Sequence, residues 1–331
     1  MTGNTQFTTE FYQKSRGCKG YTLEKRKGEE SMKSIDVFCH LMPQKYAELA
    51  MNESPNKSHM FVRALKMQAM SDMEYRKQVM EGFEGYKQIP NIVSPPVELF
   101  AGPDKSPKAA IGNDEIKKIT DSDPDRYCGF IGGIPFNNVS ASVEEIKRCK
   151  DMGAKGIQIY THMNGEAIDQ EKFWPIYEIC EKLDLPILIH PVGGQMVPEF
   201  PTEDCSKYEL WFLIGWPYQT TVAMSRLAFS GIFEDFPQLK IVTHHVGAMI
   251  PMLAGRIENG LKMYGGRTAP ELKEKLTKTK MKGNPFMQIL LLLALLPQSA
   301  VVWISLEKTT CYLPLICHLI RKRDRVILTG L

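Results

Sequence analysis

Three histidines stand where short apolar runs of the chain end. His190 closes the run 186–190, and the pair His244-His245 closes the run 240–245. Apolar runs of this length are typical of buried strands. In a (β/α)8 barrel the active site is built at the carboxyl ends of the strands, so these imidazoles predict metal or proton chemistry. The alternative is that each is a hydrogen-bonded histidine of the core.

The elements that must position these histidines alternate along the chain. Apolar runs are each followed by a stretch with helical periodicity, which is typical of repeated βα units. We therefore predict the fold class α/β, a TIM-type (β/α)8 barrel. Ser142, followed by acidic residues, is the expected N-cap of one helix. The expected strands are 127–136, 156–161, 186–190 and 239–247, and the expected helices are 142–152, 171–183, 217–235 and 249–261.

The segment 41–115 shows no clear period. Prolines interrupt it, among them Pro90, Pro95, Pro96, Pro103 and Pro107. We expect an inserted segment that lies over the barrel mouth, where such segments often shape substrate pockets.

Composition limits the kind of partner. The chain of 331 residues is long enough for one large barrel, and its net charge of +3 is too balanced to indicate nucleic acid or an anionic membrane. The expected ligand is a small molecule. Eight cysteines without a CxxC pair indicate neither a zinc knuckle nor a disulfide framework, so a cytoplasmic location is expected. No GxGxxG motif or phosphate-binding loop occurs, which argues against a nucleotide cofactor.

The first 31 residues are polar and lack the apolar core of a signal peptide. We interpret 1–31 as a disordered leader, in part a non-native extension. Met32 opens a stretch typical of a true start followed at once by a first strand. The barrel body is therefore expected to span 32–282.

Three motifs in this body resemble those of the amidohydrolase superfamily, in its aminocarboxymuconate-semialdehyde decarboxylase-like branch. They are the first-strand motif at 35–43, the motif at 187–191, and His245-x-Gly247-x3-Pro251-x4-Arg256. The resemblance covers about residues 32–280. It implies a barrel of the metal-dependent hydrolase kind that binds a divalent metal, usually zinc.

The resemblance also implies roles for individual residues. His40 and His190 correspond to metal ligands, and the spacing to Gly247 selects His245 rather than His244 as the histidine that moves a proton beside the metal. Arg256 corresponds to an arginine that reaches a substrate carboxylate in a neighbouring subunit, which implies a homodimer if the reading frame is intact. The alternative for Arg256 is a solvated helix charge or an ion pair between helices.

Two more residues are candidates for the substrate pocket. Tyr160 and His162 stand at the end of another expected strand, and we predict that they line the site. His244 is expected to lie behind the direct ligands.

The first strand departs from the family pattern. Where the family has a histidine as the first ligand, this chain has Phe38 in the sequence Phe38-Cys39-His40. Phenylalanine cannot bind a metal, so this departure concerns the metal site and not the fold. His40 and His190 alone would need a carboxylate and water to complete a site. Cys39 points to the opposite side of a regular strand and is expected in the core.

After residue 282 the βα alternation stops, and the apolar run 287–306 begins. A shift of the reading frame by one base joins the last base of each codon to the first two bases of the next. In that frame, residues 311–327 can be read as LFATDMPFDPEKGPGYI. This sequence resembles the last strands of the family and includes its metal-binding aspartate. We therefore interpret 283–331 as an out-of-frame tail, which leaves the barrel incomplete at its C-terminal strands. A membrane anchor and a genuinely novel C-terminus are the alternatives.

Together with these observations, the resemblance implies a metal-assisted decarboxylase of a small unsaturated or aromatic carboxylic acid. Decarboxylation and hydrolysis share this scaffold, so a hydrolase of a C–C, lactone or amide bond is the alternative. A third possibility is a non-catalytic, damaged barrel associated with a membrane through 287–306.

Overall fold

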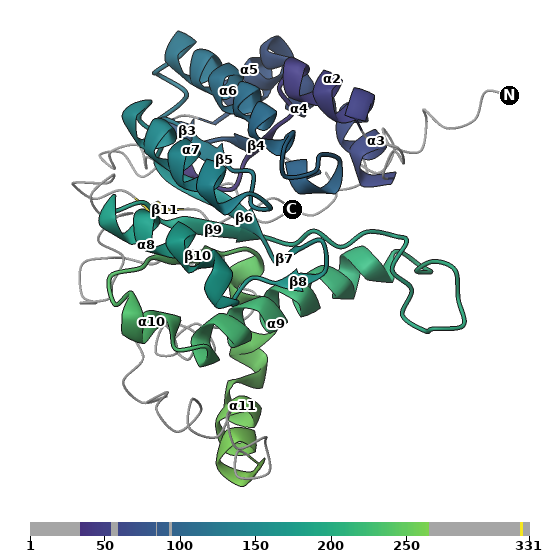
Figure 1. Ribbon diagram of the computed structural model, residues 1–331. Coiled ribbons are helices and arrows are strands. Elements are labelled where there is room, and N and C mark those ends of the chain that lie inside the picture. Colours follow the sequence, from purple (N-terminus) through teal and green to yellow (C-terminus); the bar gives the residue numbers. More distant parts are fainter. Residues whose placement is uncertain (1–33, 54–58, 84, 93–94, 265–324, 327–331) are drawn as a thin grey trace, which may run out of the picture. The chain divides into compact units, whose positions relative to one another are not determined.

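The computed structural model describes residues 34–53, 59–83, 85–92, 95–264 and 325–326 (Figure 1). The chain divides into two units, Met1–Met32 and Lys33–Leu331, and the described residues all belong to the second. The expected leader at 1–31 lies outside the described residues. So does the expected out-of-frame tail at 283–331, apart from residues 325–326.

A four-stranded parallel sheet carries two of the histidine motifs. Its strands are β5 (Ile131–Gly133), β6 (Gly156–Tyr160), β9 (Ile187–His190) and β10 (Ile241–Thr243), in the order β10-β9-β6-β5. Every residue of β6 and β9 is buried, as expected for parallel strands covered on both faces. Tyr160 pairs with His190 in the register, so two predicted site residues stand at the same edge.

The first strands form two smaller parallel sheets. β1 (Ser34–Asp36) lies between β3 (Tyr86–Gln88) and β11 (Arg325–Val326), and β2 (His40–Leu41) pairs with β4 (Asn91–Ile92). β3 and β4 lie within the segment 41–115, whose sequence shows no clear period. Such short strands leave no periodic signal in the sequence. The α/β barrel class is confirmed, although the described strands do not close a barrel.

Helices follow the strands close to their expected positions. The one predicted over 142–152 is α7 (Val139–Asp151), which begins three residues earlier than expected because the side chain of Asn138 accepts a hydrogen bond from the amide of Ala141 at 3.0 Å. Ser142 is buried in the first turn, where its hydroxyl donates to the carbonyl of Pro135. The other helices that follow these strands in the chain are α8 (Trp174–Lys182), α9 (Trp216–Phe229), α10 (Ile232–Asp235) and α11 (Ile250–Tyr264).

The segment between β2 and β5 is largely helical. It contains α2 (Gln44–Glu53), α3 (His59–Lys66), α4 (Gln68–Ser71), α5 (Met73–Glu81) and α6 (Ala110–Ser122), with 3-10 turns η2 (Val97–Leu99) and η3 (Ser106–Ala109). After β6 come the hairpin β7 (His162–Met163) and β8 (Glu166–Ala167) and the turn η4 (Glu171–Phe173). A π-helical turn, η5 (Trp211–Gly215), precedes α9, and η6 (His245–Gly247) follows β10. No helix of the described residues is long and apolar enough to cross a membrane.

The core lies between the four-stranded sheet and its helices. Isoleucines of β6 and β9 pack against fully buried side chains of the helices, and Phe136 stacks on Phe173 with ring centroids 4.6 Å apart. The fully buried helical side chains include Ile146, Cys149, Ile176, Tyr177, Cys180, Met224 and Leu227.

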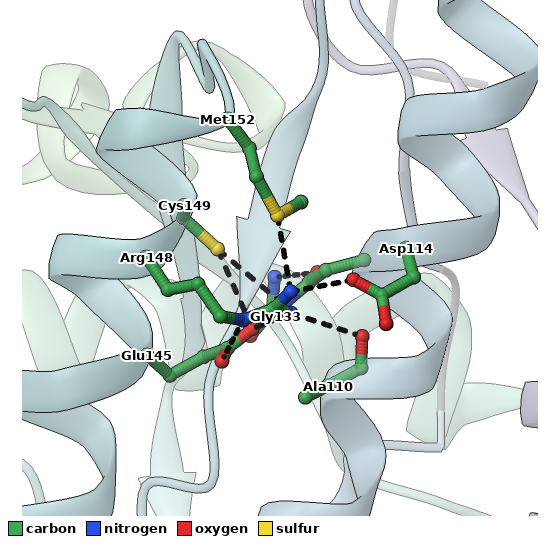
Figure 2. A network of polar contacts seen from close by, with 8 residues as sticks. Ala110, Asp114, Gly133, Glu145, Arg148, Cys149 and Met152 are labelled. Atoms are coloured by element: carbon green, nitrogen blue, oxygen red, sulfur yellow. Dashed lines mark hydrogen bonds and ion pairs between the residues drawn. The ribbon is translucent and has the colours of Figure 1, made fainter.

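A polar network fixes the carboxyl end of β5 against its helices (Figure 2). Asn113 of α6 donates to the carbonyl of Gly133 at 2.7 Å and accepts from its amide at 2.8 Å. Glu145 of α7 accepts from both Asn113 and Arg148, and Arg148 also forms an ion pair with Asp114. The buried polar side chains of this network are hydrogen-bonded to one another or to the backbone of β5. We therefore interpret the network as a structural support of the sheet.

Candidate metal centre

Three imidazoles meet where β9 and β10 end and β2 begins. His40 comes from β2, His190 ends β9, and His244 follows β10 directly, and each offers a ring nitrogen within 4.8 Å of the others. The ring centroids of His190 lie 5.0 Å from His40 and 4.5 Å from His244. The structure thus brings the two predicted ligands together and adds His244, which the sequence placed behind them.

Hydrogen bonds at Nδ1 determine which nitrogen of each ring is free. The Nδ1 of His244 lies 2.8 Å from the carbonyl oxygen of Ile189, and the Nδ1 of His190 faces the carbonyl oxygen of Pro191. A carbonyl oxygen only accepts, so Nδ1 carries the proton and Nε2 keeps its lone pair. The Nδ1 of His40 faces the side-chain oxygen of Asn91 in the same way.

This arrangement is the one that metal-binding histidines adopt, since a ligating imidazole almost always donates its other N–H to an oxygen. The Nε2 of His244 is buried and has no hydrogen-bond partner among the described residues. An orphaned buried acceptor costs free energy unless a ligand satisfies it. The three Nε2 atoms can therefore hold a divalent metal.

Burial also keeps these rings in the form that binds metals. Desolvation lowers the pKa of His40, and it lowers the pKa values of His190 and His244 well below the ordinary value, with the neighbouring imidazoles adding to the effect. The rings are consequently neutral near pH 7, and neutral imidazole is the ligand form. Within the described residues no carboxylate joins the group. Three histidines with an open fourth position are a known catalytic zinc geometry.

Phe38, which stands where the resemblance implies a metal ligand, packs against this cluster. Its ring centroid lies 4.1 Å from that of His244 in an edge-to-face arrangement. Such a contact is favourable and limits the rotation of the His244 ring. The position that would supply a ligand in the family thus supports a different imidazole here.

His245 lies beside the cluster rather than in it. Its ring centroid is 6.0 Å from His244 and 6.3 Å from Trp216, and its φ of 54° turns the chain away from the direction of β10. Burial lowers its pKa, and its Nδ1 has no hydrogen-bond partner among the described residues. A neutral imidazole at this distance can exchange a proton with a molecule bound next to the cluster.

The remaining predicted site residues separate into two groups. Tyr160 is buried at the end of β6, with its ring centroid 5.7 Å from His190. His162 is half-buried on β7, where its Nδ1 accepts from the amide of Gly165 at 3.1 Å. The side chain of Arg256 is exposed on α11. The structure therefore places Tyr160 at the cluster and shows no contact of His162 or Arg256 with it.

Two buried residues carried no signal in the sequence, one beside His190 and one whose charge acts on Tyr160. Trp216 at the start of α9 has its ring centroid 5.7 Å from His190 and donates its indole N–H to the carbonyl of Gly193. Glu98 in η2 is only 5% exposed, and burial raises the pKa of its carboxyl to about 8. The charge of Glu98, after burial, also raises the pKa of Tyr160. A single glutamate in a proline-rich segment gives no sign that tertiary packing will bury it.

A cavity of about 340 Å³ lies elsewhere. Its lining includes Gly129 and Lys155, which precede β5 and β6 and so mark the amino ends of these strands. Active sites of this fold class occupy the opposite, carboxyl face, so the histidine cluster and not this cavity is the candidate site.

Comparison with known proteins agrees with this placement. The family model described as Amidohydrolase matches residues 106–266. The resemblance seen in the sequence is thereby confirmed over a segment that contains β5 to β10 and two of the three clustered histidines.

Relatives and solved structures extend the likeness. The 2-amino-3-carboxymuconate-6-semialdehyde decarboxylase of Dictyostelium discoideum is 36% identical over 152 residues, which are 45% of this chain and 40% of the relative. The gamma-resorcylate decarboxylase of Polaromonas sp. is 26% identical over 203 residues, 59% of this chain and 62% of the relative. This chain thus spans about half the length of these curated relatives.

The structure of 5-carboxyvanillate decarboxylase from Novosphingobium aromaticivorans, solved with bound manganese, superimposes with a TM-score of 0.62 at 23% identity, covering 75% of this chain and 76% of that one. At this identity the likeness establishes the fold.

Proposed function

We propose that this protein is a metal-assisted carboxy-lyase of a small unsaturated or aromatic carboxylic acid. The observation that carries the proposal is the cluster of three imidazoles, His40, His190 and His244, each of which offers a ring nitrogen within 4.8 Å of the others. Two of them lie in the segment that matches the amidohydrolase family model. The decarboxylases among its relatives support the choice of reaction.

A divalent metal fits these residues, and we place zinc first because three imidazoles with an open position suit it. When bound, such an ion lowers the pKa of a water or hydroxyl and polarises an oxygen of a bound molecule. The manganese in the 5-carboxyvanillate decarboxylase structure makes manganese the alternative.

The side chains of this chain would carry the proton and orient the substrate. His245 in its protonated form would give a proton to the ring or alkene carbon that bears the carboxylate, and the bond from that carbon to the carboxylate would then break and release CO2. One proton is consumed and one CO2 is formed, so the acid is converted into the corresponding hydrogen compound. Tyr160 would contact the substrate beside His190, and Arg256 would bind its carboxylate across a homodimer interface, where a planar guanidinium matches the two oxygens.

Cytoplasmic location belongs to the same proposal. The five cysteines of the described residues are free thiols, in agreement with a reducing compartment. His162, which lies on the hairpin after β6, would contact the outer part of a substrate.

The proposal is tested by measuring CO2 release and metal content together. The protein, loaded with zinc or manganese, is offered a panel of hydroxybenzoates and muconates. We expect CO2 release with at least one member and its loss on metal removal. Hydrolysis of a lactone or amide substrate without CO2 release would favour the hydrolase instead, and no turnover of any substrate by a fully metallated protein would contradict both.

A further inference from the structure

A chain of three hydrogen bonds joins a buried cation to a buried anion next to the candidate ligand His40. The Nε of Arg76 donates to Oε1 of Gln88 at 2.8 Å, Nε2 of Gln88 donates to the hydroxyl of Tyr86 at 2.9 Å, and that hydroxyl donates to Oδ2 of Asp36 at 2.7 Å. Every donor lies on the arginine side of its acceptor. Hydrogen bonds aligned in one direction polarise and strengthen one another.

Both ends of this chain hold the backbone that carries His40. Arg76 also donates through Nη1 to the carbonyl of His40 at 2.9 Å, and Oδ1 of Asp36 accepts from the amide of Phe38 at 2.9 Å. Between these two points the chain leaves regular strand geometry, because β1 ends at Asp36 and β2 begins at His40. Side-chain hydrogen bonds therefore supply part of the order that a strand ladder would give.

Charge compensation requires the intermediate side chains. Arg76 is 6% exposed and Asp36 is 7% exposed, and a buried charge is costly unless it is paired and hydrogen-bonded. Within the described part of the chain no direct ion pair joins these two groups, so Gln88 and Tyr86 connect them. Burial, and then the charge of Asp36, raise the pKa of Tyr86, so the phenol keeps the proton that it donates.

We propose that Arg76, Gln88, Tyr86 and Asp36 form a positioning relay for His40, which directs its Nε2 toward those of His190 and His244. The inference rests on the proposed metal function. None of the four residues binds the metal. The relay acts through the backbone on both sides of residues 37–39, while Asn91 orients the ring itself.

The test is Tyr86→Phe, which deletes the central donor and acceptor and adds no volume. The matched control is Tyr177→Phe, because the Tyr177 hydroxyl also donates one hydrogen bond, at 2.8 Å, to the carbonyl of Ile168 in another part of the core. The metal-free forms of both variants and the wild type are titrated with Co²⁺, whose visible absorption reports the geometry of its ligands.

We expect Tyr86→Phe to bind Co²⁺ about 10- to 100-fold more weakly, with a changed absorption band, since this is the usual effect of losing a group that orients a ligand. Tyr177→Phe should lower thermal stability to a similar degree and leave Co²⁺ binding unchanged. Wild-type affinity in Tyr86→Phe, or an equal loss in Tyr177→Phe, would overturn the relay.

A second measurement separates failure of the relay from failure of the metal function. If wild-type protein binds no Co²⁺, the proposed metal function is wrong, and the relay is then judged by amide hydrogen exchange of Phe38. This amide should exchange several-fold faster in Tyr86→Phe than in wild type and unchanged in Tyr177→Phe. Equal exchange in all three proteins would show that the relay does not hold this segment.

Discussion

Replacing Glu98 by glutamine tests the electrostatic description of the candidate site. The Glu98 side chain is buried, and its Oε2 has no hydrogen-bond partner among the described residues. Burial raises the pKa of this carboxyl from 4.5 to about 8, because the buried position disfavours the charged form. Near pH 7 we therefore expect a neutral acid.

The sign of the pH dependence follows from these values. Between pH 4.5 and about 8 the folded state holds a proton that the unfolded chain has released, so this stabilising contribution is complete below pH 4.5 and is lost as pH rises through about 8. At 1.36 kcal/mol per pH unit, the loss amounts to about 5 kcal/mol. Glu98→Gln cannot ionise and escapes this loss.

The assay is urea denaturation of wild type and variant at pH 5 and at pH 9. We expect the two proteins to agree within about 1 kcal/mol at pH 5, and the variant to be more stable by about 3 to 5 kcal/mol at pH 9. The control, Glu178→Gln, removes a half-exposed carboxylate paired with Lys182 and should change stability by less than about 1 kcal/mol at both pH values. A difference between wild type and Glu98→Gln that is the same at pH 5 and pH 9 would refute the reasoning.

Three other experiments test separate parts of the description. A Cβ at Gly156 would stand 2.8 Å from the Pro186 carbonyl oxygen, so Gly156→Ala should lower the free energy of unfolding by about 1 to 3 kcal/mol. Gly194→Ala, where a Cβ would have no atom within 4 Å, should leave it unchanged. Equal melting temperatures of the two variants would contradict the packing at Gly156. In a frame-restored protein, His244→Ala should lose metal binding, and His245→Ala should keep the metal but lose turnover about a hundredfold; the reverse result would exchange their roles. Restoring the frame after about residue 278 should raise metal content and thermal stability together, and a chain as written that is already monodisperse and fully metallated would rule out the frameshift.

The sequence predicted those parts of the fold that repeat over several residues. The buried run ending at His190 is visible because a parallel strand covered on both faces needs continuous apolar side chains. The run that contains β10 is also apolar, although its residues are only partly buried. The two- and three-residue strands β2, β3 and β4 are too short for any period, and long-range pairing alone defines them. The sequence could locate the histidines, but not every strand that surrounds them.

Buried charges were not predictable for a related reason. Arg76 and Glu98 look like ordinary surface charges of a helix and a loop, and the fold buries both. Burial of a charged group depends on which partners tertiary packing provides. The guanidinium of Arg76 donates hydrogen bonds to the side-chain amide of Gln88 and to the carbonyl of His40. Burial raises the pKa of Glu98, so we expect its carboxyl to be neutral near pH 7.

His244 and His245 are adjacent in the sequence, but their backbone conformations suit them to different roles. His244 has extended φ and ψ values of −65° and 165°, so it continues the direction of β10, and its Nδ1 bonds to Ile189 of the neighbouring strand. His245 has a left-handed φ, so its ring leaves that line. Spacing to Gly247 identifies His245 in the family pattern, while strand geometry identifies His244 as the third imidazole. The two assignments are compatible, because the residue fixed by the sheet suits a ligand, which must not move, and the residue after it suits a proton carrier, which must reach the substrate.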